Sequence, residues 1–227
     1  AVSGRDLTKM SEDALALLGK LANMGRSATL MPLLKIAPRT DVVIPTKNYQ
    51  VICVTSANAL KTPGVADRFK NIPLLAVGPQ SLDAARQAGF AHASAPGGDV
   101  HGLSAAVKAK FDPQAGPVLY LSGAETAADW RAILEASGFT VERVITYDAV
   151  AQKPAGLENA LSQADGVLLY SPRTARIWCD LAAGLETPAA RPIYYCLSEN
   201  VAKILPQHWK KRVAKTPDES AMLALLD

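Results

Sequence analysis

Short apolar runs alternate along the chain with longer stretches in which apolar residues recur at helical spacing. Runs of four or five residues rich in β-branched and aromatic side chains are typical of buried strands. Each run ends in turn residues, and this alternation predicts layered α/β structure with mostly parallel strands. The predicted strands are 51–54, 74–77, 118–121, 167–170 and 193–197.

The helical stretches carry recognisable end signals. Leu15, Leu18 and Leu21 recur near helical spacing after Ser11, which is a suitable N-terminal cap. Gly89 follows another helical stretch at the position where a C-terminal glycine is favoured. The predicted helices are 11–21, 81–88, 125–136 and 174–185.

A weak internal repeat predicts two related α/β units. The order strand, polar turn, helix, strand, polar turn occurs from 51 to 81 and again from 167 to 200. Two such units in one chain predict a bilobed protein, and a cleft between lobes is a common ligand site. The extended segments 31–38 and 144–150 are the expected linkers. The alternative is that both are ordinary sheet strands.

Composition describes an ordinary globular protein. The 227 residues fit one large domain or two small ones, and 49% are hydrophobic, which is enough for a real core. A net charge of +3, spread along the chain, is too weak for a nucleic-acid binder but suits a small acidic ligand. No apolar stretch reaches the roughly 18 residues of a membrane span. We therefore expect neither a nucleic-acid nor a membrane partner.

The cysteines point to a reducing compartment. Cys53, Cys179 and Cys196 lie in apolar runs, and no C-x-x-C pair occurs. Widely spaced cysteines of this kind are typical of buried, reduced thiols. The first residues also lack the pattern of a secretory signal peptide. We expect a cytoplasmic protein.

Motifs for common cofactors are missing from the sequence. There is no G-x-G-x-x-G turn, no P-loop, no H-E-x-x-H or paired-cysteine zinc site, and no G-x-S-x-G elbow. Asp99 and His101 would need a third partner to act as a catalytic pair. Their ordinary interpretation is a glycine-rich surface loop before a helix. We expect no cofactor and no metal.

Hydroxyl and amide side chains gather where the predicted strands end. They are Thr55, Ser56, Asn58, Ser122, Ser171 and Ser198. In open α/β sheets ligands bind beyond the carboxyl ends of strands, where helix N-termini offer N–H groups to carboxylates or phosphates. The alternative is that these side chains only cap helices. The two are compatible, because a capped terminus keeps other N–H groups for a ligand.

The order of these motifs resembles the uroporphyrinogen-III synthase family. Val54–Ala59 is similar to its TSANAV strand end, and Ala76–Ser81 to its AVGxxTA segment. Tyr170-Ser171-Pro172 resembles its second strand end, and Pro32-Leu33-Leu34 its first crossing between lobes. The similarity covers nearly the whole chain. The segment Leu197–Asn200 departs from the family's glycine and threonines.

The resemblance implies two flavodoxin-like parallel-sheet lobes joined by a two-stranded linker. Lobe one would comprise 1–33 and 152–227, and lobe two 38–146. The linker strands would be 34–37 and 147–151.

The resemblance also implies a cofactor-independent, cyclising hydro-lyase of tetrapyrrole and heme biosynthesis. Its substrate would be hydroxymethylbilane and its product uroporphyrinogen III. The reaction loses water and inverts ring D through a spiro intermediate, so catalysis would rest on positioning. The protein would be a monomer that receives its substrate by transient hand-off from the preceding enzyme.

The resemblance assigns roles to particular residues. Tyr147 would assist departure of the substrate hydroxyl, because a phenol donates a hydrogen bond at neutral pH. The alternative is a tyrosine that only packs the linker. Substrate would be bound by Arg5, Thr55, Ser56, Asn58, Gly78, Ser81, Ser122, Gly123, Ser171, Arg173 and Ser198.

Three other functions stay open at this point. The first is a bilobed protein that binds a small anion without chemistry. The second is a degenerate synthase homologue, which the altered Leu197–Asn200 segment would favour. The third is a flavodoxin-like protein that binds FMN.

Overall fold

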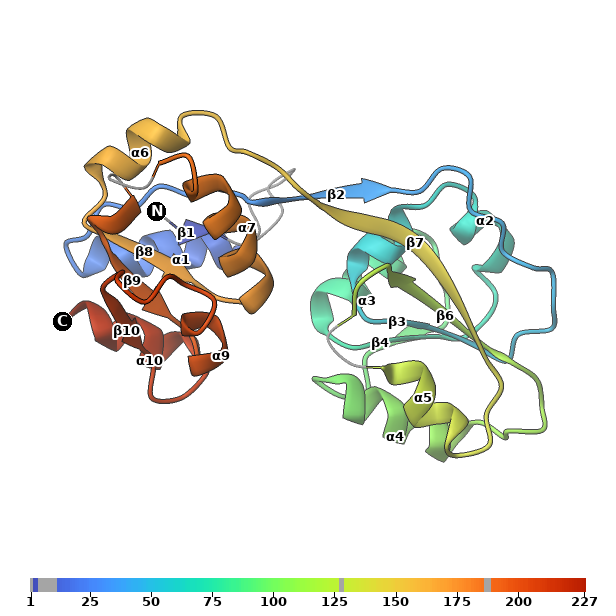
Figure 1. The fold of residues 1–227 in the computed structure, drawn as a ribbon. Helices are drawn as coiled ribbons and strands as arrows, with labels where there is room; N and C mark the ends of the chain where they lie inside the picture. The colour runs from blue at the N-terminus through green and yellow to red at the C-terminus, as the bar shows by residue number, and fades with distance from the viewer. Residues whose placement is uncertain (1, 4–11, 127–128, 186–188) are drawn as a thin grey trace. The chain divides into compact units, whose positions relative to one another are not determined.

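The computed structural model describes residues 2–3, 12–126, 129–185 and 189–227 (Figure 1). The chain forms two compact units. Unit 1 comprises Ala1–Lys35 and Val150–Asp227, and unit 2 comprises Ile36–Ala149. The boundaries fall inside strand β2 (Leu34–Pro38) and near the end of strand β7 (Val141–Ala151).

Unit 2 is built on a six-stranded sheet in the order β2-β7-β6-β3-β4-β5. The remaining strands are β3 (Val51–Val54), β4 (Leu74–Ala76), β5 (Ala93–Ser94) and β6 (Val118–Gly123). The strands from β3 to β7 pair in parallel. Strand β2 runs antiparallel to β7, because Arg39 N bonds Thr146 O while Gln152 N bonds Leu33 O. The α/β class is confirmed, and the sheet of unit 2 is mixed rather than wholly parallel.

Unit 1 carries a four-stranded sheet in the order β1-β8-β9-β10, paired in parallel throughout. Its strands are β1 (Val2–Ser3), β8 (Gly166–Leu169), β9 (Ile193–Cys196) and β10 (Lys211–Val213). The neighbours β8 and β9 occupy the same positions in this sheet as β3 and β4 in unit 2. This equivalence accounts for the internal repeat in the sequence.

Strand order gives the topology of unit 2. Counted along the chain, its parallel strands lie in the order 3-2-1-4-5, whereas a flavodoxin-like sheet is 2-1-3-4-5. The flavodoxin order is recovered when β6 and β7 are counted first. Unit 2 therefore has the 3-2-1-4-5 order of the Rossmann doubly wound fold, and it matches the flavodoxin-like order only after circular permutation.

Helices begin where the sequence supplies a cap. Pro172 occupies the first turn of α7, behind the capping Ser171, and Pro79 does the same in α3, behind Gly78. The helix expected from 125 starts later, because Asp129 caps α5. The bounds are α1 Glu12–Asn23, η1 Ala57–Lys61, α2 Val65–Phe69, α3 Pro79–Gln87, α4 Val100–Lys110, α5 Trp130–Glu135, α6 Leu157–Gln163, α7 Pro172–Ala182, α9 Glu199–Ala202, α10 Glu219–Leu223 and η2 Ala224–Leu226. The expected cap Ser11 lies outside the described residues.

Each face of the unit 2 sheet is covered by helices (Figure 1). Ile52 and Val54 belong to a core cluster with residues of η1, α2 and α3, here called the Ile52 cluster. Val51 and Cys53 belong to a second cluster with α4 and α5, here called the Val51 cluster. Because both faces are buried, β3 is an unbroken apolar run instead of an alternating one.

Unit 1 has an aromatic core. Trp178 and Tyr194 are 1% and 0% exposed, and the Tyr194 ring stacks on Trp209 at 4.6 Å. The polar ends of these rings are satisfied, since Trp178 Nε1 donates to Tyr194 Oη at 3.2 Å and Tyr194 Oη donates to Ala189 O at 2.7 Å. Buried tyrosine and tryptophan stabilise a core when their polar atoms find such partners.

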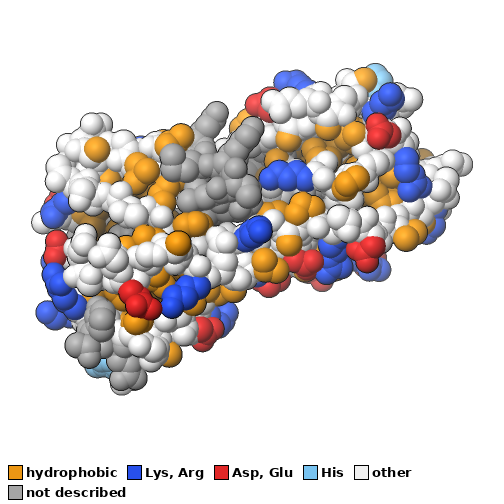
Figure 2. Space-filling view, turned by 90° about the horizontal axis from the view of Figure 1, so that it is seen from above, with side chains coloured by type: hydrophobic (Ala, Val, Ile, Leu, Met, Phe, Trp, Pro, Cys, Tyr) orange, Lys and Arg blue, Asp and Glu red, His pale blue; other side chains and the backbone are white. Residues whose placement is uncertain are grey.

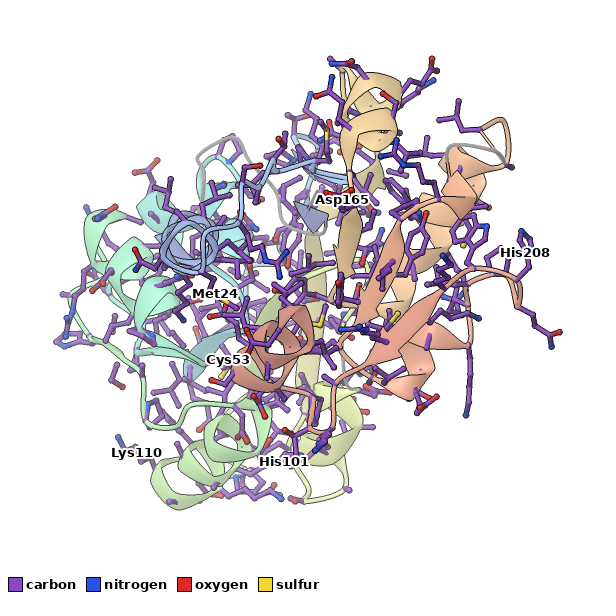
Figure 3. All side chains as sticks on the ribbon, turned by 90° about the vertical axis from the view of Figure 1, so that its left-hand side faces the viewer. Met24, Cys53, His101, Lys110, Asp165 and His208 are labelled. Atoms are coloured by element: carbon purple, nitrogen blue, oxygen red, sulfur yellow. The ribbon has the colours of Figure 1, made fainter. Side chains whose placement is uncertain are left out.

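Of the three cysteines expected to be buried, Cys53 and Cys196 are buried and Cys179 is half-buried. Cys53, Cys179 and Cys196 are free thiols, and burial raises the pKa of Cys196 to about 11. Cys53 lies inside unit 2, whereas His101 and His208 lie on the outside (Figure 3).

Lysine and arginine are interspersed with aspartate and glutamate over the surface in view (Figure 2). None of the helices in the described part of the chain is long and apolar enough to span a membrane.

Candidate functional site

The carboxyl ends of the parallel strands bring several predicted residues to one edge of unit 2. In register, Val54 of β3 lies opposite Ala76 of β4 and Leu121 of β6. The polar turns that follow these strands therefore lie side by side. The turns and helix starts carry Thr55, Ser56, Asn58, Gly78 and Ser81, and the last two residues of β6 are Ser122 and Gly123. This is the edge at which open α/β sheets bind ligands.

Tyr147 lies at this edge, over the last residue of β6. Gly123 pairs with Tyr147 in the β6–β7 ladder. A Cβ added to Gly123 would lie 2.7 Å from two ring carbons of Tyr147 and 2.9 Å from its hydroxyl. Position 123 therefore has room for hydrogen only, and the Tyr147 hydroxyl sits directly beside the main chain of the strand end.

The Tyr147 side chain is held in place by packing. Its ring is half-buried and packs against the Ile52 cluster. Within the described residues, no side chain or main-chain group forms a hydrogen bond with this hydroxyl. A phenol that is fixed by packing at one end and free at the other is suited to donate a hydrogen bond to a bound molecule.

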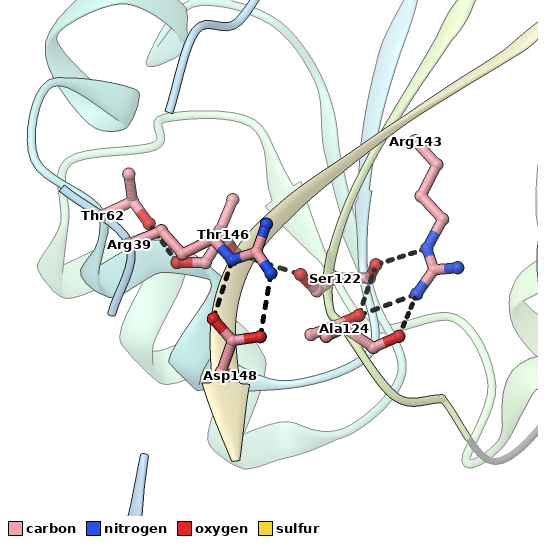
Figure 4. Close-up of polar contacts among 8 residues, drawn as sticks. Arg39, Thr62, Ser122, Ala124, Arg143, Thr146 and Asp148 are labelled. Carbon is pink, nitrogen blue, oxygen red and sulfur yellow. Dashed lines mark hydrogen bonds and ion pairs between the residues drawn. The ribbon is translucent and has the colours of Figure 1, made fainter. Parts of the chain in front are cut away.

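Arg143 forms hydrogen bonds to the end of β6 and to the residue that follows it. Its Nε donates to Ser122 Oγ at 2.8 Å, and its Nη2 donates to Gly123 O at 2.8 Å and Ala124 O at 3.0 Å (Figure 4). Ser122 is only 1% exposed, and its hydroxyl also donates to Gly123 O. In this structure Ser122 thus shapes the loop through protein contacts, and its side chain does not face solvent.

Thr55 and Tyr120 share a polar contact beside this loop. Thr55 Oγ1 and Tyr120 Oη lie 3.3 Å apart. Burial raises the pKa of Tyr120, and the hydrogen bond with Thr55 opposes that rise in part. Tyr120 therefore stays a neutral phenol that orients the threonine hydroxyl at the strand end.

Several of the predicted hydroxyls act as helix caps. Ser56 Oγ accepts the main-chain N–H of Asn58 at 3.2 Å, at the start of η1. Ser171 Oγ accepts the N–H of Thr174 at 3.1 Å, at the start of α7. Ser198 has the extended backbone of a cap, but its side chain makes no capping bond to α9. The capping interpretation therefore describes Ser56 and Ser171, and the Ser198 side chain does not serve as a cap.

The other predicted residues divide between the units. In unit 2, Gly78 caps α3 through its backbone and Ser81 is buried inside that helix. In unit 1, Ser171 and Ser198 follow β8 and β9, and Arg173 lies half-buried in the first turn of α7. Arg5 lies outside the described residues.

The turn that departs most from the family pattern keeps the backbone geometry of its counterpart. Leu197 N donates to Leu169 O at 3.1 Å after β9, just as Val77 N donates to Val54 O at 3.1 Å after β4. The next residue is extended in both turns and precedes a helix. The altered side chains of Leu197–Asn200 have therefore not changed the course of the main chain, and helix N–H groups remain at this strand end.

Asp148, which follows Tyr147 in the sequence, forms an ion pair with Arg39 through two hydrogen bonds. Arg39 Nε donates to Asp148 Oδ2 at 2.8 Å, and Nη2 donates to Oδ1 at 2.9 Å (Figure 4). The hydrogen bond from Arg39 holds the pKa of Asp148 below its ordinary value. Both side chains are partly exposed, at 41% and 34%, so salt screens the pair.

This pair gives a pH dependence whose sign follows from the lowered pKa. We expect the stability contributed by Asp148 to be complete above the unfolded-state pKa of about 3.9 and to be lost as pH falls through the lower folded-state value. Urea unfolding of the parent and of Asp148→Asn measures it. The difference in unfolding free energy should be positive at neutral pH and shrink towards about pH 3. A difference that is independent of pH and of salt would contradict this assignment.

Sequence reasoning missed several residues that build the site. Arg143, Thr146, Thr62 and Tyr120 make the contacts that fix the end of β6. A cation near the start of a strand, in Val141-Glu142-Arg143-Val144, was the available signal for Arg143. The described part of the chain contains no group of three His, Cys, Asp or Glu side chains placed to hold a metal ion.

Comparison with a model of a known protein family identifies the family of the chain. A family model described as uroporphyrinogen-III synthase HemD matches residues 16–224. The chain belongs to the uroporphyrinogen-III synthase family. Enzymes of this family are hydro-lyases of tetrapyrrole biosynthesis. A search of curated protein sequences found no match to this chain.

One solved structure supports this fold. The uroporphyrinogen-III synthetase of Helicobacter pylori superposes with a TM-score of 0.63 at 18% identity, over 87% of this chain and 91% of that one. A mutant uroporphyrinogen III synthase of Thermus thermophilus gives a TM-score of 0.46 at 16% identity, over 99% of this chain and 96% of that one. At this identity the Helicobacter structure supports the fold of the chain.

Proposed function

We propose that this chain is an active uroporphyrinogen-III synthase. It converts hydroxymethylbilane to uroporphyrinogen III with loss of water and inversion of ring D. The observation that carries the proposal, within a chain of this family, is the Tyr147 hydroxyl, which stands beside Gly123 without a protein partner among the described residues, at the ligand-binding edge of unit 2. The reaction is inferred from family membership. The Tyr147 hydroxyl is the hydrogen-bond donor that the first step of this reaction needs.

Tyr147 assists the first step. The hydroxymethyl carbon of the substrate loses its oxygen as water when that oxygen accepts a proton or a hydrogen bond, and a conjugated azafulvene cation remains. A phenol that donates to the leaving oxygen lowers the barrier of this step, and positioned donors typically contribute about 10²–10⁴-fold. The donated proton leaves with the water molecule, and the proton that a pyrrole carbon releases at the final ring closure restores the phenol.

The following steps depend on the conformation of the bound chain. The last pyrrole attacks the azafulvene through its substituted carbon and forms a spiro intermediate. That intermediate fragments, and reclosure inverts the ring. Free substrate closes without inversion, so the protein must hold the ends of the linear tetrapyrrole where the substituted carbon reacts first.

The strand ends supply groups that suit the carboxylates of the substrate. In unit 2 these are Thr55, Asn58 and the N–H groups at the starts of η1 and α3. In unit 1 they are Arg173, Ser198 and the N–H groups at the start of α7. Helix N-termini and hydroxyl groups bind carboxylates by donating hydrogen bonds, and this binding requires no strongly acidic or basic side chain. Arg5 remains a prediction from the family resemblance.

Turnover separates this proposal from its alternatives. Hydroxymethylbilane is incubated with increasing protein, and its disappearance is compared with the spontaneous rate. We expect acceleration in proportion to enzyme concentration and saturation with substrate. Saturable binding of the bilane without acceleration would overturn the proposal in favour of an anion-binding protein or a degenerate homologue. Yellow preparations that contain FMN would favour the flavodoxin alternative.

A further inference from the structure

Between two consecutive paired positions of β6, strand β7 contains one extra residue. Ser122 pairs with Ile145, and the next residue of β6, Gly123, pairs with Tyr147. Thr146 therefore has no partner on β6, and the ladder contains a β-bulge at this residue. Bulges re-aim the side chains that follow them and are common next to active sites.

The bulge changes the face on which Tyr147 lies. Side chains alternate between faces along a regular strand. Val141 packs in the Val51 cluster, and Val144, three residues later, packs against the Ile52 cluster on the other face. Regular alternation would return Tyr147, three residues later again, to the Val51 face. It instead packs against the Ile52 cluster, because the extra residue shifts the alternation by one.

Buried hydrogen bonds hold the bulge in this form. Thr146 is 0% exposed, and its Oγ1 donates to Ser122 O at 3.3 Å. Its carbonyl accepts from Thr62 Oγ1 at 3.0 Å and from Arg39 N at 2.8 Å (Figure 4). Thr62 is itself only 5% exposed. Buried polar groups are costly to leave unpaired, so the bulge cannot relax without breaking several of these bonds.

The strand end on the β6 side is fixed as well. Ala124 N donates to Tyr147 O at 3.0 Å. Arg143 holds the carbonyls of Gly123 and Ala124 from the β7 side (Figure 4). Main-chain contacts therefore hold Gly123 and Tyr147 next to each other.

We propose that Thr146 and Thr62 are positioning residues for the reaction. They do not touch the substrate but set the bulge, and the bulge sets the place of the Tyr147 hydroxyl. This inference rests on the proposed function of Tyr147. Loss of either threonine hydroxyl lets the bulge shift and moves the phenol away from the leaving oxygen, so the spontaneous closure to the type I isomer gains on the catalysed one.

The test compares isosteric and conservative substitutions. Thr146→Val and Thr62→Val remove one hydroxyl each, while Thr146→Ser and Thr62→Ser keep it. Thr140→Val makes the same chemical change at an exposed position just before β7 and serves as the control. We expect the valine variants to lose about tenfold or more in kcat with little change in KM, since small misplacements of reacting groups can cost up to about 100-fold. The serine variants should recover most of the rate.

A second readout follows the tyrosine itself. The proteins are labelled with 3-fluorotyrosine, and the Tyr147 fluorine resonance is identified by its absence in Tyr147→Phe. We expect this resonance to shift in both valine variants and to return in the serine variants, with no shift in Thr140→Val. If Thr146→Val fails to fold, Thr62→Val carries the test from a different segment of the chain.

The two proposals fail in distinguishable ways. Valine variants with the parent's kcat, isomer ratio and fluorine resonance would overturn the positioning role. An inactive parent protein would overturn the synthase function, and the fluorine resonance would still report whether the threonines place Tyr147. A rate loss that serine does not rescue would also contradict the proposal, because it would trace to packing and not to the hydroxyl.

Discussion

A Tyr147→Phe variant is expected to form uroporphyrinogen III at least about tenfold more slowly than the parent, because one positioned proton donor typically contributes about 10²–10⁴-fold. Its stability should hardly change. The lost hydroxyl has no hydrogen-bond partner among the described residues, so no buried group is left unpaired. Initial rates and urea unfolding of the two proteins provide the measurement.

Tyr195→Phe is a matched control for this substitution. The Tyr195 ring also lies over a glycine, since a Cβ on Gly166 would come within 2.6 Å of it. Gly166 opens β8, however, so this tyrosine lies at the amino end of that strand and not at the ligand-binding edge. Tyr195→Phe should keep the parent's rate. Unchanged turnover in Tyr147→Phe would remove Tyr147 from the mechanism.

A Gly123→Ala variant is expected to lose both stability and activity. Its methyl group would overlap the Tyr147 ring at 2.7 Å, and the main chains of both residues are tied to each other. Overpacking of this kind typically costs about 1–3 kcal/mol. Displacement of the ring should also lower turnover at least as much as Tyr147→Phe does. Gly98→Ala, where a Cβ would meet no atom within 4 Å, is the control for stability.

A double substitution tests whether the clash with the Tyr147 ring causes the loss of stability in Gly123→Ala. If the methyl group clashes with the ring, the stability cost of Gly123→Ala should vanish in a Tyr147→Ala background. Urea unfolding of the four proteins of this cycle gives the coupling free energy. Additive effects would show that Gly123 is required for another reason, and the proposed contact between the two residues would not explain its presence.

The sequence was most informative where burial is complete. The prediction of 51–54 matches β3 at both ends, because all four residues are buried and polar turns bound the run. Caps place some helix ends away from their predicted positions. The helix α5 starts at Trp130 and not near 125, because Asp129 is its cap. Strands such as β5 are too short to show a hydrophobic pattern at all.

The site was predictable only in part. Hydroxyls such as Thr55 could be placed at strand ends from local sequence, because parallel strands end at one edge. The bulge at Thr146 could not, since a bulge is a property of two paired strands and the register is fixed by tertiary contacts. For the same reason, local sequence contains no sign that Ser122 is buried under Arg143.

The isomer composition of the product tests the central claim most directly. Hydroxymethylbilane is supplied with and without the purified protein, and the oxidised products are separated into type I and type III uroporphyrins. We expect mostly type III in the presence of the protein, with a fraction that rises with enzyme concentration. Only type I, formed at the uncatalysed rate, would contradict the assignment of synthase activity to this chain.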